Sequence, residues 1–358
     1  MSAKGSPRRS PTAKPRLSEI SEALGLSKTA VSRALRDMPD ISEATRKRVK
    51  AYASKIGYRP NLAARSLATS RNQTIGVGMG AFSNPFFQDV VYALLQETRA
   101  KKMSLSLLEL APDPASGDLR LFPEGGGAID ALVVLEGWYE RSPTANELRD
   151  LDRNVVRTIY RGNLESDDID QIVVDWRSAA FDITRYLLLL GHRNIAILRG
   201  IGTVRADNSA SLCQKTLGSR DACEQFDVPW DSVAIRRFPS HYAHAKQAAL
   251  EVLLRKPRPT AIICHTDYLA VGAMRAAQDL GLSVPRDLSV TGFNNIELGA
   301  YLPVALTTIG HPIKDVGREI VQRVVARIDA GRPPERFRSA VPHELIIRES
   351  CQPPPNLT

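Results

Sequence analysis

The sequence predicts a small all-α helix-turn-helix headpiece joined to a larger α/β body of two doubly wound subdomains. The first 72 residues hold 16 Lys and Arg against 5 Asp and Glu, and three short helical patterns fit among them. From Thr74 onward, apolar runs of strand length alternate with helical patterns. Such runs, separated by helices, indicate parallel sheets that are covered on both faces. A length of 358 residues is enough for two or three folding units.

The charge balance limits the kinds of partner. The net charge is +9, and it divides into +11 for residues 1–72 and −2 for the remainder. A basic headpiece on a near-neutral body predicts a polyanionic partner for the headpiece alone, with nucleic acid first and an anionic membrane surface second. No run approaches the roughly 18 apolar residues of a membrane span, and the N-terminus lacks the apolar segment of a secretory signal. We therefore expect a cytoplasmic, nucleoid-associated protein with no membrane partner.

Motifs for catalysis and metal binding are missing from the sequence. The four cysteines show no CxxC spacing, which is typical of reduced cytosolic thiols rather than a disulfide framework or a zinc site. The glycines of residues 76–80 lack the GxGxxG spacing of a dinucleotide loop, and no Walker lysine, GxSxG or HExxH motif occurs. His241 and His244 have no evident third ligand, so we interpret them as solvated. The sequence predicts no enzyme and no cofactor.

The headpiece pattern begins after residues 1–16, whose Ser, Pro, Lys and Arg content predicts a disordered basic tail. Residues 17–60 then fit three short helices. In the second helix Val31, Ala34 and Leu35 share one face, and Ser27 is placed to cap its start. The opposite stripe carries hydrogen-bonding and basic side chains, namely Lys28, Thr29, Ser32, Arg33 and Arg36. An anchored helix with such a stripe is suited to the DNA major groove.

A third helix, residues 42–56, is expected to turn Val49, Ala53 and Ile56 inward and its basic side chains outward. In the body, a helix is expected near 86–101. The apolar runs number about ten, which exceeds one doubly wound sheet and favours two subdomains. The nine clearest runs lie at 74–80, 104–110, 129–136, 155–160, 171–175, 194–200, 260–264, 287–293 and 344–349.

Longer motifs are specific to one family. The headpiece contains LSKTAVSRAL, ISEATRKRV, GYRPN and ARSL, and the body contains NPFF, LGHRNIA, LTTI and ELIIRES. On these motifs, which span about residues 17–350, the chain resembles the lac repressor family of transcription regulators. The resemblance implies a sensor domain of the periplasmic-binding-protein type I fold, a double-stranded DNA operator and a small-molecule effector.

The resemblance also implies roles for individual headpiece residues. Lys28 and Thr29 occupy the positions that discriminate operators, and Arg33 matches a base-contacting arginine able to bind guanine O6 and N7. Phosphate contacts are expected from Ser27, Thr29, Ser32 and Asn61. For Ser27, helix capping is an alternative role that is compatible with a phosphate contact.

Residues 61–72 correspond to the family's hinge helix and linker. By resemblance, Leu67 wedges between central base pairs of a pseudo-palindromic operator that is bound by a homodimer, and Arg65 faces phosphate or groove. Without the resemblance, Leu67 is an ordinary apolar linker residue. Because so short a helix is marginal by itself, small changes in the body can control its formation.

The effector-binding domain is expected at residues 73–350, followed by a tail at 351–358. By resemblance, the chain crosses between the subdomains near 172, 303 and 337. Subdomain one then comprises about 73–171 and 303–337, and subdomain two comprises 172–302 and 338–350. The segment 111–128 is shortened against the helix that the family usually has there.

The cleft between the subdomains is the expected effector site. By resemblance, Phe86 and Phe87 stack on a ring, with core packing as the alternative. Trp138 and Arg161 follow first-subdomain strands, where ligands of open sheets bind, and a surface aromatic is the alternative for Trp138. The second subdomain is expected to contribute Lys215, Asp267 and Asn294.

Two departures from the family bear on the ligand. Lys215 stands where the family usually has Arg, and Asn294 stands where Asp is common. A neutral amide beside a cation favours an anionic effector, such as a sugar acid or phosphate, over a neutral sugar. A transport binding protein would fit the body, but the headpiece and the missing signal argue against it. The absence of a heptad repeat after Arg348 favours a dimer over a tetramer.

Overall fold

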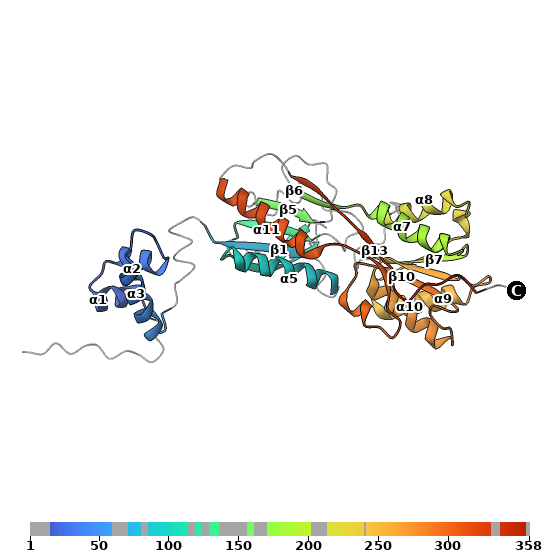
Figure 1. Ribbon diagram of the computed structural model, residues 1–358, viewed down its shortest axis with the longest axis horizontal. Helices are drawn as coiled ribbons and strands as arrows, with labels where there is room; N and C mark the ends of the chain where they lie inside the picture. Colours follow the sequence, from blue (N-terminus) through green and yellow to red (C-terminus); the bar gives the residue numbers. More distant parts are fainter. Residues whose placement is uncertain are drawn as a thin grey trace, which may run out of the picture. The chain divides into compact units, whose positions relative to one another are not determined.

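The computed structural model divides into two compact units, Met1–Asn72 and Gln73–Thr358. It describes residues 15–58, 71–79, 85–112, 119–122, 129–135, 156–160, 170–201, 213–239, 241–330 and 337–355. Figure 1 shows a helical first unit and an α/β second unit, which confirms the expected fold class. Within the described residues, no helix is both long and apolar enough to cross a bilayer.

The headpiece consists of α1 (Leu17–Leu24), α2 (Lys28–Leu35) and α3 (Glu43–Lys55). Gly25 ends α1 with a φ of 66°, a left-handed conformation that glycine adopts without steric cost. The Oγ of Ser27 accepts a hydrogen bond from the Ala30 N–H at 3.1 Å and caps α2. The expected cap of the second helix is therefore present.

Five side chains form the buried core of the headpiece, and every helix contributes to it. They are Ile20, Val31, Ala34, Val49 and Ala53. The inward faces expected for the second and third helices are confirmed. Docking of these faces leaves Lys28 and Thr29 of α2 exposed to solvent.

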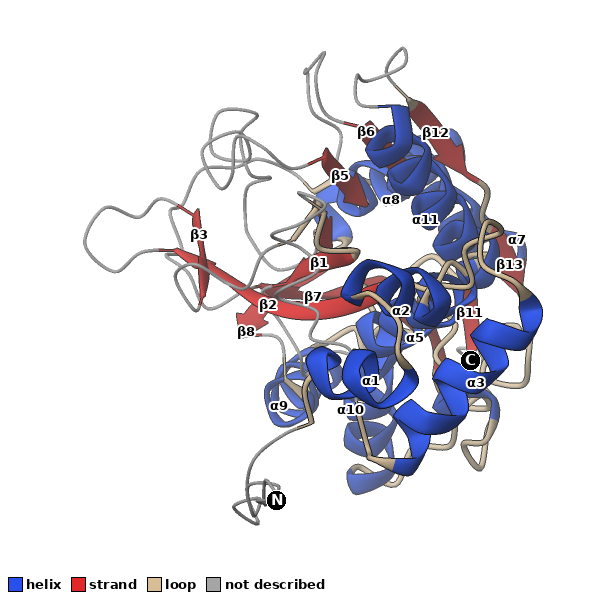
Figure 2. Ribbon diagram, turned by 90° about the vertical axis from the view of Figure 1, so that its left-hand side faces the viewer, coloured by secondary structure: helices blue, strands red, loops and turns tan. Residues whose placement is uncertain are grey.

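The first sheet of the body contains seven described strands in the order β12-β6-β5-β4-β1-β2-β3. Their bounds are β1 (Thr74–Met79), β2 (Ser104–Pro112), β3 (Leu119–Phe122), β4 (Ala131–Leu135), β5 (Val156–Tyr160), β6 (Asp170–Val174) and β12 (Arg338–Val341). The strands pair in parallel except β2 with β3. Figure 2 shows this antiparallel pair at the sheet edge, and β3 lies within the segment that the sequence marks as atypical.

Two long helices pack against this sheet, α5 (Pro85–Ala100) and α11 (Ile313–Ala330). They approach each other closely at Gly317, where an added Cβ would lie 2.7 Å from the Cβ of Ala93. A glycine is needed at this crossing because any larger residue would push the helices apart.

The second sheet contains six described strands in the order β13-β11-β10-β9-β7-β8. Their bounds are β7 (Ile195–Ile201), β8 (Ala234–Pro239), β9 (Ala261–Cys264), β10 (Ser289–Phe293), β11 (Thr307–Gly310) and β13 (Glu344–Ile346). Only β13 is antiparallel to its neighbour. The accompanying helices are α7 (Trp176–Leu189), α8 (Gln214–Gln225), α9 (Tyr242–Leu253) and α10 (Asp267–Asp279), with short 3-10 helices at Trp230–Ser232 and Glu297–Ala300.

Helices cover both faces of the second sheet. In β7, Ile195 and Ile197 pack with the apolar side chains of α7 and α8, whereas Ala196 and Leu198 pack with those of α9 and α10. Figure 1 shows the two helix pairs on opposite sides of the strands. The apolar runs of the sequence correspond to this two-sided burial.

The chain crosses between the sheets later than the sequence analysis places it. β6 remains in the first sheet to Val174, so the first crossing follows 174 rather than 172. Residues 307–310 belong to the second sheet and 338–341 to the first, opposite to the expected assignment. The reason is backbone pairing: Thr307 is in register with Thr291, and Arg338 with Gln171, so each strand stays in its sheet to its end.

Candidate functional site

The start of α2 presents a polar edge to solvent. Ser27, Lys28 and Thr29 are exposed, while Val31 and Ala34 on the opposite face are fully buried. Buried side chains hold the helix, so its exposed N-terminal turn is displayed in a defined orientation. Ser32 is half-buried, and its carbonyl accepts a hydrogen bond from the Nε of Arg36 at 3.2 Å.

Arg33 has an intramolecular partner that the sequence analysis missed. Its Nη2 lies 2.9 Å from the Oδ2 of Asp40, and both side chains are a little under half exposed. Such exposed pairs stabilise a fold by at most about 1 kcal/mol, so a phosphate or a base can displace the carboxylate. The only sequence signal was an acidic residue shortly after the helix, which is too common to be informative.

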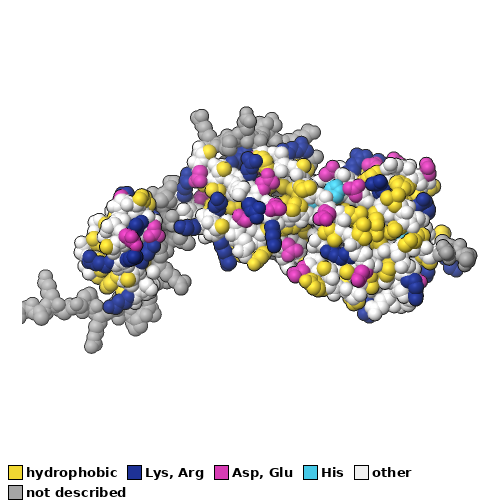
Figure 3. All heavy atoms as spheres, in the orientation of Figure 1, with side chains coloured by type: hydrophobic (Ala, Val, Ile, Leu, Met, Phe, Trp, Pro, Cys, Tyr) yellow, Lys and Arg dark blue, Asp and Glu magenta, His cyan; other side chains and the backbone are white. Residues whose placement is uncertain are grey.

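The basic side chains of α3 also have partners within the headpiece. The Nζ of Lys50 lies 2.6 Å from the Oδ1 of Asp37, and the Nζ of Lys47 lies 2.7 Å from the Oε1 of Glu43. Figure 3 shows acidic side chains beside basic ones on the visible face of the headpiece. These pairs reduce the local positive potential around α3, so the start of α2 is the better candidate for contacting an anion.

Three predicted DNA contacts, Asn61, Arg65 and Leu67, lie outside the described residues. The same holds for Trp138 and Arg161 among the predicted effector contacts. Their roles stay predictions.

A second group of polar side chains lies at the carboxyl edge of the second sheet. His265 follows β9, Asp267 begins α10, Asn294 follows β10, and Lys215 lies in the first turn of α8. Carboxyl ends of parallel strands share one edge, where ligands of open α/β sheets bind. The structure thus brings together Lys215, Asp267 and Asn294, all three predicted from the sequence.

Lys215 is a nearly buried cation at this edge. Its side chain is 8% exposed, and its Nζ donates a hydrogen bond to the carbonyl oxygen of His265 at 2.6 Å. The ammonium lies 4.2 Å from the ring centre of Trp176 and 4.4 Å from that of Phe293. Aromatic faces attract a cation, so the two rings help to hold this charge in a site with little water. Trp176 is a site residue that the sequence analysis missed. It begins α7 directly after the first crossing between the sheets, where no sequence motif marks it.

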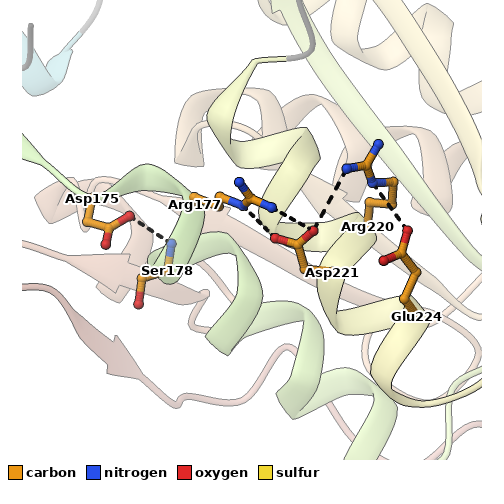
Figure 4. A network of polar contacts seen from close by, with 6 residues as sticks. All are labelled: Asp175, Arg177, Ser178, Arg220, Asp221 and Glu224. Carbon is orange, nitrogen blue, oxygen red and sulfur yellow. Dashed lines mark hydrogen bonds and ion pairs between the residues drawn. The ribbon is translucent and has the colours of Figure 1, made fainter. Parts of the chain in front are cut away.

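Packing between α7 and α8 sets the position of Lys215. Figure 4 shows the guanidinium of Arg177 bound to Asp221, with Nε–Oδ2 and Nη2–Oδ1 distances of 2.5 and 3.0 Å, and Arg220 beside Glu224. About one turn before Asp221, the helices touch at Gly218, where an added Cβ would lie 1.9 Å from the carbonyl oxygen of Arg177. The first turn of α8 is therefore fixed on α7.

Asp267 is fully buried, and both of its oxygens have protein partners. Oδ1 accepts a hydrogen bond from the hydroxyl of Thr308 at 2.5 Å, and Oδ2 accepts one from the backbone N–H of Ile296 at 2.8 Å. Burial raises the pKa of this carboxyl group to about 7. These contacts connect α10, β11 and the loop after β10, and so hold the loop that carries Asn294.

Asn294 is 3% exposed and has a φ of 104°. Neither its Oδ1 nor its Nδ2 has a hydrogen-bond partner among the described residues. Leaving such a group unpaired in a protein costs about 1–3 kcal/mol, so a molecule that pairs with this amide would recover part of that free energy. Asn294 lines a pocket of about 710 Å³ together with Asp89 and Tyr92 of α5 and with His311 and Arg348. Known ligand pockets have volumes of about 300–1,000 Å³.

Phe86 and Phe87 are buried at the start of α5, at 0% and 1% exposure, with ring centres 5.5 Å apart. They belong to the apolar cluster that includes β1 and β4. This is the core packing given as the alternative in the sequence analysis, and ligand stacking by either ring stays a prediction. The described residues contain no group of three or more His, Cys, Asp and Glu side chains suited to a metal ion.

Comparisons with known proteins match the headpiece and the body to two different kinds of domain. Residues 16–61 match the model of bacterial regulatory proteins of the lacI family, and residues 184–351 match a periplasmic binding protein-like domain. Full-length relatives include the transcriptional repressor CytR of Escherichia coli, 29% identical over 91% of this chain and 93% of its own. The PurR repressor of Pectobacterium carotovorum is 28% identical over 95% and 98%.

Solved structures share the fold. The lac repressor dimer bound to operator and an anti-inducer superimposes with a TM-score of 0.75 at 20% identity, covering 95% of this chain and 100% of its own. A regulator from Enterococcus faecium with bound ribose gives a TM-score of 0.66 at 20% identity, covering 78% and 99%. At this level of identity the likeness concerns the fold alone.

A helix-turn-helix headpiece followed by a periplasmic-binding-protein-like α/β body defines the class of ligand-controlled, DNA-binding transcription regulators, not of enzymes. Within that class, residues 16–61 match the lacI-family model, and the relatives CytR and PurR are transcriptional repressors.

Proposed function

We propose that this chain represses transcription as a homodimer on a pseudo-palindromic operator, under the control of an anionic, carbohydrate-derived effector such as a sugar acid or sugar phosphate. It would act in the cytoplasm, on the bacterial nucleoid. The exposed edge of Ser27, Lys28 and Thr29 on an anchored helix supports the DNA-binding part. The unpaired amide of Asn294, at the same sheet edge as the cation of Lys215, supports the effector part.

In this proposal Arg33 leaves Asp40 to read a base, while Ser27, Thr29, Ser32 and Asn61 contact phosphates. Leu67 of the hinge helix wedges between base pairs, and Arg65 lies along the groove. In the body, Phe86, Phe87 and Trp138 supply apolar contacts to the effector. Arg161 and Lys215 supply positive charge, and Asp267 keeps the loop of Asn294 in place.

The DNA contacts are tested with operators selected from a pool of random duplexes. Arg33→Ala is expected to weaken binding of the selected operator by about 1–3 kcal/mol, with a smaller loss on random DNA, because a base contact is sequence-specific. Lys47→Ala, which removes a cation paired on α3, is the matched control and should cost less. Asp40→Asn should tighten binding severalfold, because it releases Arg33 and removes a negative charge. An equal loss on both DNAs for Arg33→Ala would assign it to phosphate instead.

The effector class is tested by thermal shift with gluconate, glucose 6-phosphate and glucose. Because a ligand that binds only the native state raises the melting temperature, the two anions should raise it and glucose should not. The effect of the anions should disappear in Lys215→Met, which keeps most of the length of the side chain without its charge. Equal shifts with glucose, or unchanged anion shifts in the variant, would contradict an anionic effector.

A further inference from the structure

Cys213 lies beside the effector site in an unusual environment for a thiol. It occupies the N-cap position of α8 and is half-buried. Its Sγ lies 3.7 Å from the Nδ1 of His265 and 3.6 Å from the Oγ1 of Thr216. Lys215, two residues along, donates a hydrogen bond to the backbone of the same histidine. The thiol, the imidazole and the ammonium therefore form one cluster at the carboxyl edge of the second sheet.

Electrostatics distinguish Cys213 from the other cysteines. Burial by itself would raise the pKa of this thiol, but the facing His265 and the charge of Arg199 outweigh burial and lower the pKa well below its usual range. Because burial also lowers the pKa of His265, the hydrogen bond from its ring is the part of this effect that geometry supports. Burial raises the pKa of Cys223 and of Cys351 to about 11 in each case, and it also raises the pKa of Cys264. An ordinary thiol, with a pKa near 8.5, is only about 3% thiolate at pH 7. Cys213 alone of the four is placed to be a thiolate nucleophile.

An unpaired buried group beside the thiol offers a bound molecule a hydrogen-bonding partner. His265 is 5% exposed, and its Nε2 has no hydrogen-bond partner in the part of the chain that the structure describes. Asn294, at the same sheet edge, has two such atoms. The rings of Trp176 and Phe293 flank the ammonium of Lys215 and supply apolar walls. This combination suits a small, flat molecule that carries a carbonyl oxygen.

We propose that Cys213 is a modification site for small α,β-unsaturated carbonyl compounds, and that its modification changes operator affinity. Modification of Cys213, the chemical part of the proposal, is inferred from the cluster of Cys213, His265 and Lys215. The regulatory part rests on the proposed function.

The reaction balances without an oxidant. The Sγ thiolate attacks the β-carbon and forms a C–S bond, and the electron pair of the C=C bond moves to the carbonyl group as an enolate. The enolate then takes a proton at its α-carbon from His265 or from water, which leaves a thioether. Lys215 is near enough to the cluster to favour the enolate electrostatically. The adduct would occupy the wall of the effector site next to Lys215 and exclude the effector.

The chemical part is tested on the full-length protein with N-ethylmaleimide, a conjugated carbonyl compound. Mass spectrometry follows labelling at each cysteine from pH 5.5 to 9. Cys213 should react at least about tenfold faster at pH 7 than each of the other three, since thiolate fraction outweighs the lower nucleophilicity of an acidic thiol. His265→Gln should slow this reaction and move its pH profile upward, whereas Cys351→Ser, a matched control, should change neither. Labelling of Cys213 no faster than the others, or an unshifted profile in His265→Gln, would overturn the site.

The regulatory part is tested by measuring affinity for a selected operator before and after labelling. Labelling should change the affinity severalfold in the wild type and leave Cys213→Ser unchanged. Rapid labelling with unaltered operator affinity would overturn the regulatory part. Absence of operator binding by the unlabelled protein would instead contradict the proposed function. The two failures can be distinguished because the labelling rates are measured without DNA.

Discussion

At the scale of single residues, Asp267 shows how burial makes stability depend on pH. Its folded-state pKa of about 7 exceeds the ordinary value of 3.8, so the native state holds the proton more tightly than the unfolded chain. The stability that this protonation contributes is fully present below pH 4 and is lost as the pH rises through 7. Between pH 6 and pH 8 we expect the free energy of unfolding to fall by about 1.4 kcal/mol on account of this group. Urea denaturation at several pH values measures this change.

Asp267→Asn provides the comparison. The asparagine cannot ionise, so the fall between pH 6 and pH 8 should be smaller in the variant by that amount. A loss of stability that is independent of pH is expected in addition, because the amide NH₂ cannot accept the hydrogen bond from Ile296. Identical pH dependence in the two proteins would show that Asp267 titrates normally.

At the scale of elements, the contact between α7 and α8 positions the first turn of α8. Gly218→Ala would place a Cβ 1.9 Å from the backbone oxygen of Arg177, which a rotamer change cannot relieve. We expect destabilisation of about 3 kcal/mol, at the upper end for overpacking, and weaker effector binding as Lys215 shifts. Gly299→Ala is the matched control, because its Cβ would lie 3.6 Å from that of Leu306, an ordinary contact. Thermal melts that place both variants within about 1 kcal/mol of wild type would refute the packing argument.

At the scale of the whole molecule, the headpiece and the body have separate cores. Five buried side chains support the headpiece, which makes it the less stable unit, whereas two large clusters support the body. Calorimetry of the full chain should give a small transition at low temperature and a larger one above it. A fragment of residues 73–358 should retain only the larger transition, and operator DNA should raise the smaller one. A single transition that DNA shifts as a whole would contradict independent units.

Local patterns predicted much of the fold. The apolar runs at 74–80, 129–136, 260–264 and 287–293 became β1, β4, β9 and β10, because a strand buried on both faces is apolar throughout. Four strands were missed, namely β3, β8, β11 and β12. Three of these have four residues each, and β8 carries Arg236 and Arg237. Such strands form because a neighbouring strand offers backbone hydrogen bonds, which no local pattern records.

The sequence likewise placed some residues of the candidate sites and not others. Spacing along one helix was enough to place Val31 and Ala34 inward and Lys28 and Thr29 outward, since side chains three and four residues apart share a face. The resemblance to the family likewise marked Lys215, Asp267 and Asn294, two of them as departures from its usual residues.

By itself, the sequence determined what neighbouring residues decide: the helices of the headpiece, the buried strands, and the family that its motifs resemble. Only the tertiary structure decided which distant groups meet. It set Arg33 against Asp40, left the amide of Asn294 unpaired among the described residues, and brought Cys213 to His265, 52 residues further on. Pairing, burial and pKa depend on distances in space, and those distances follow from how the two sheets and their helices pack.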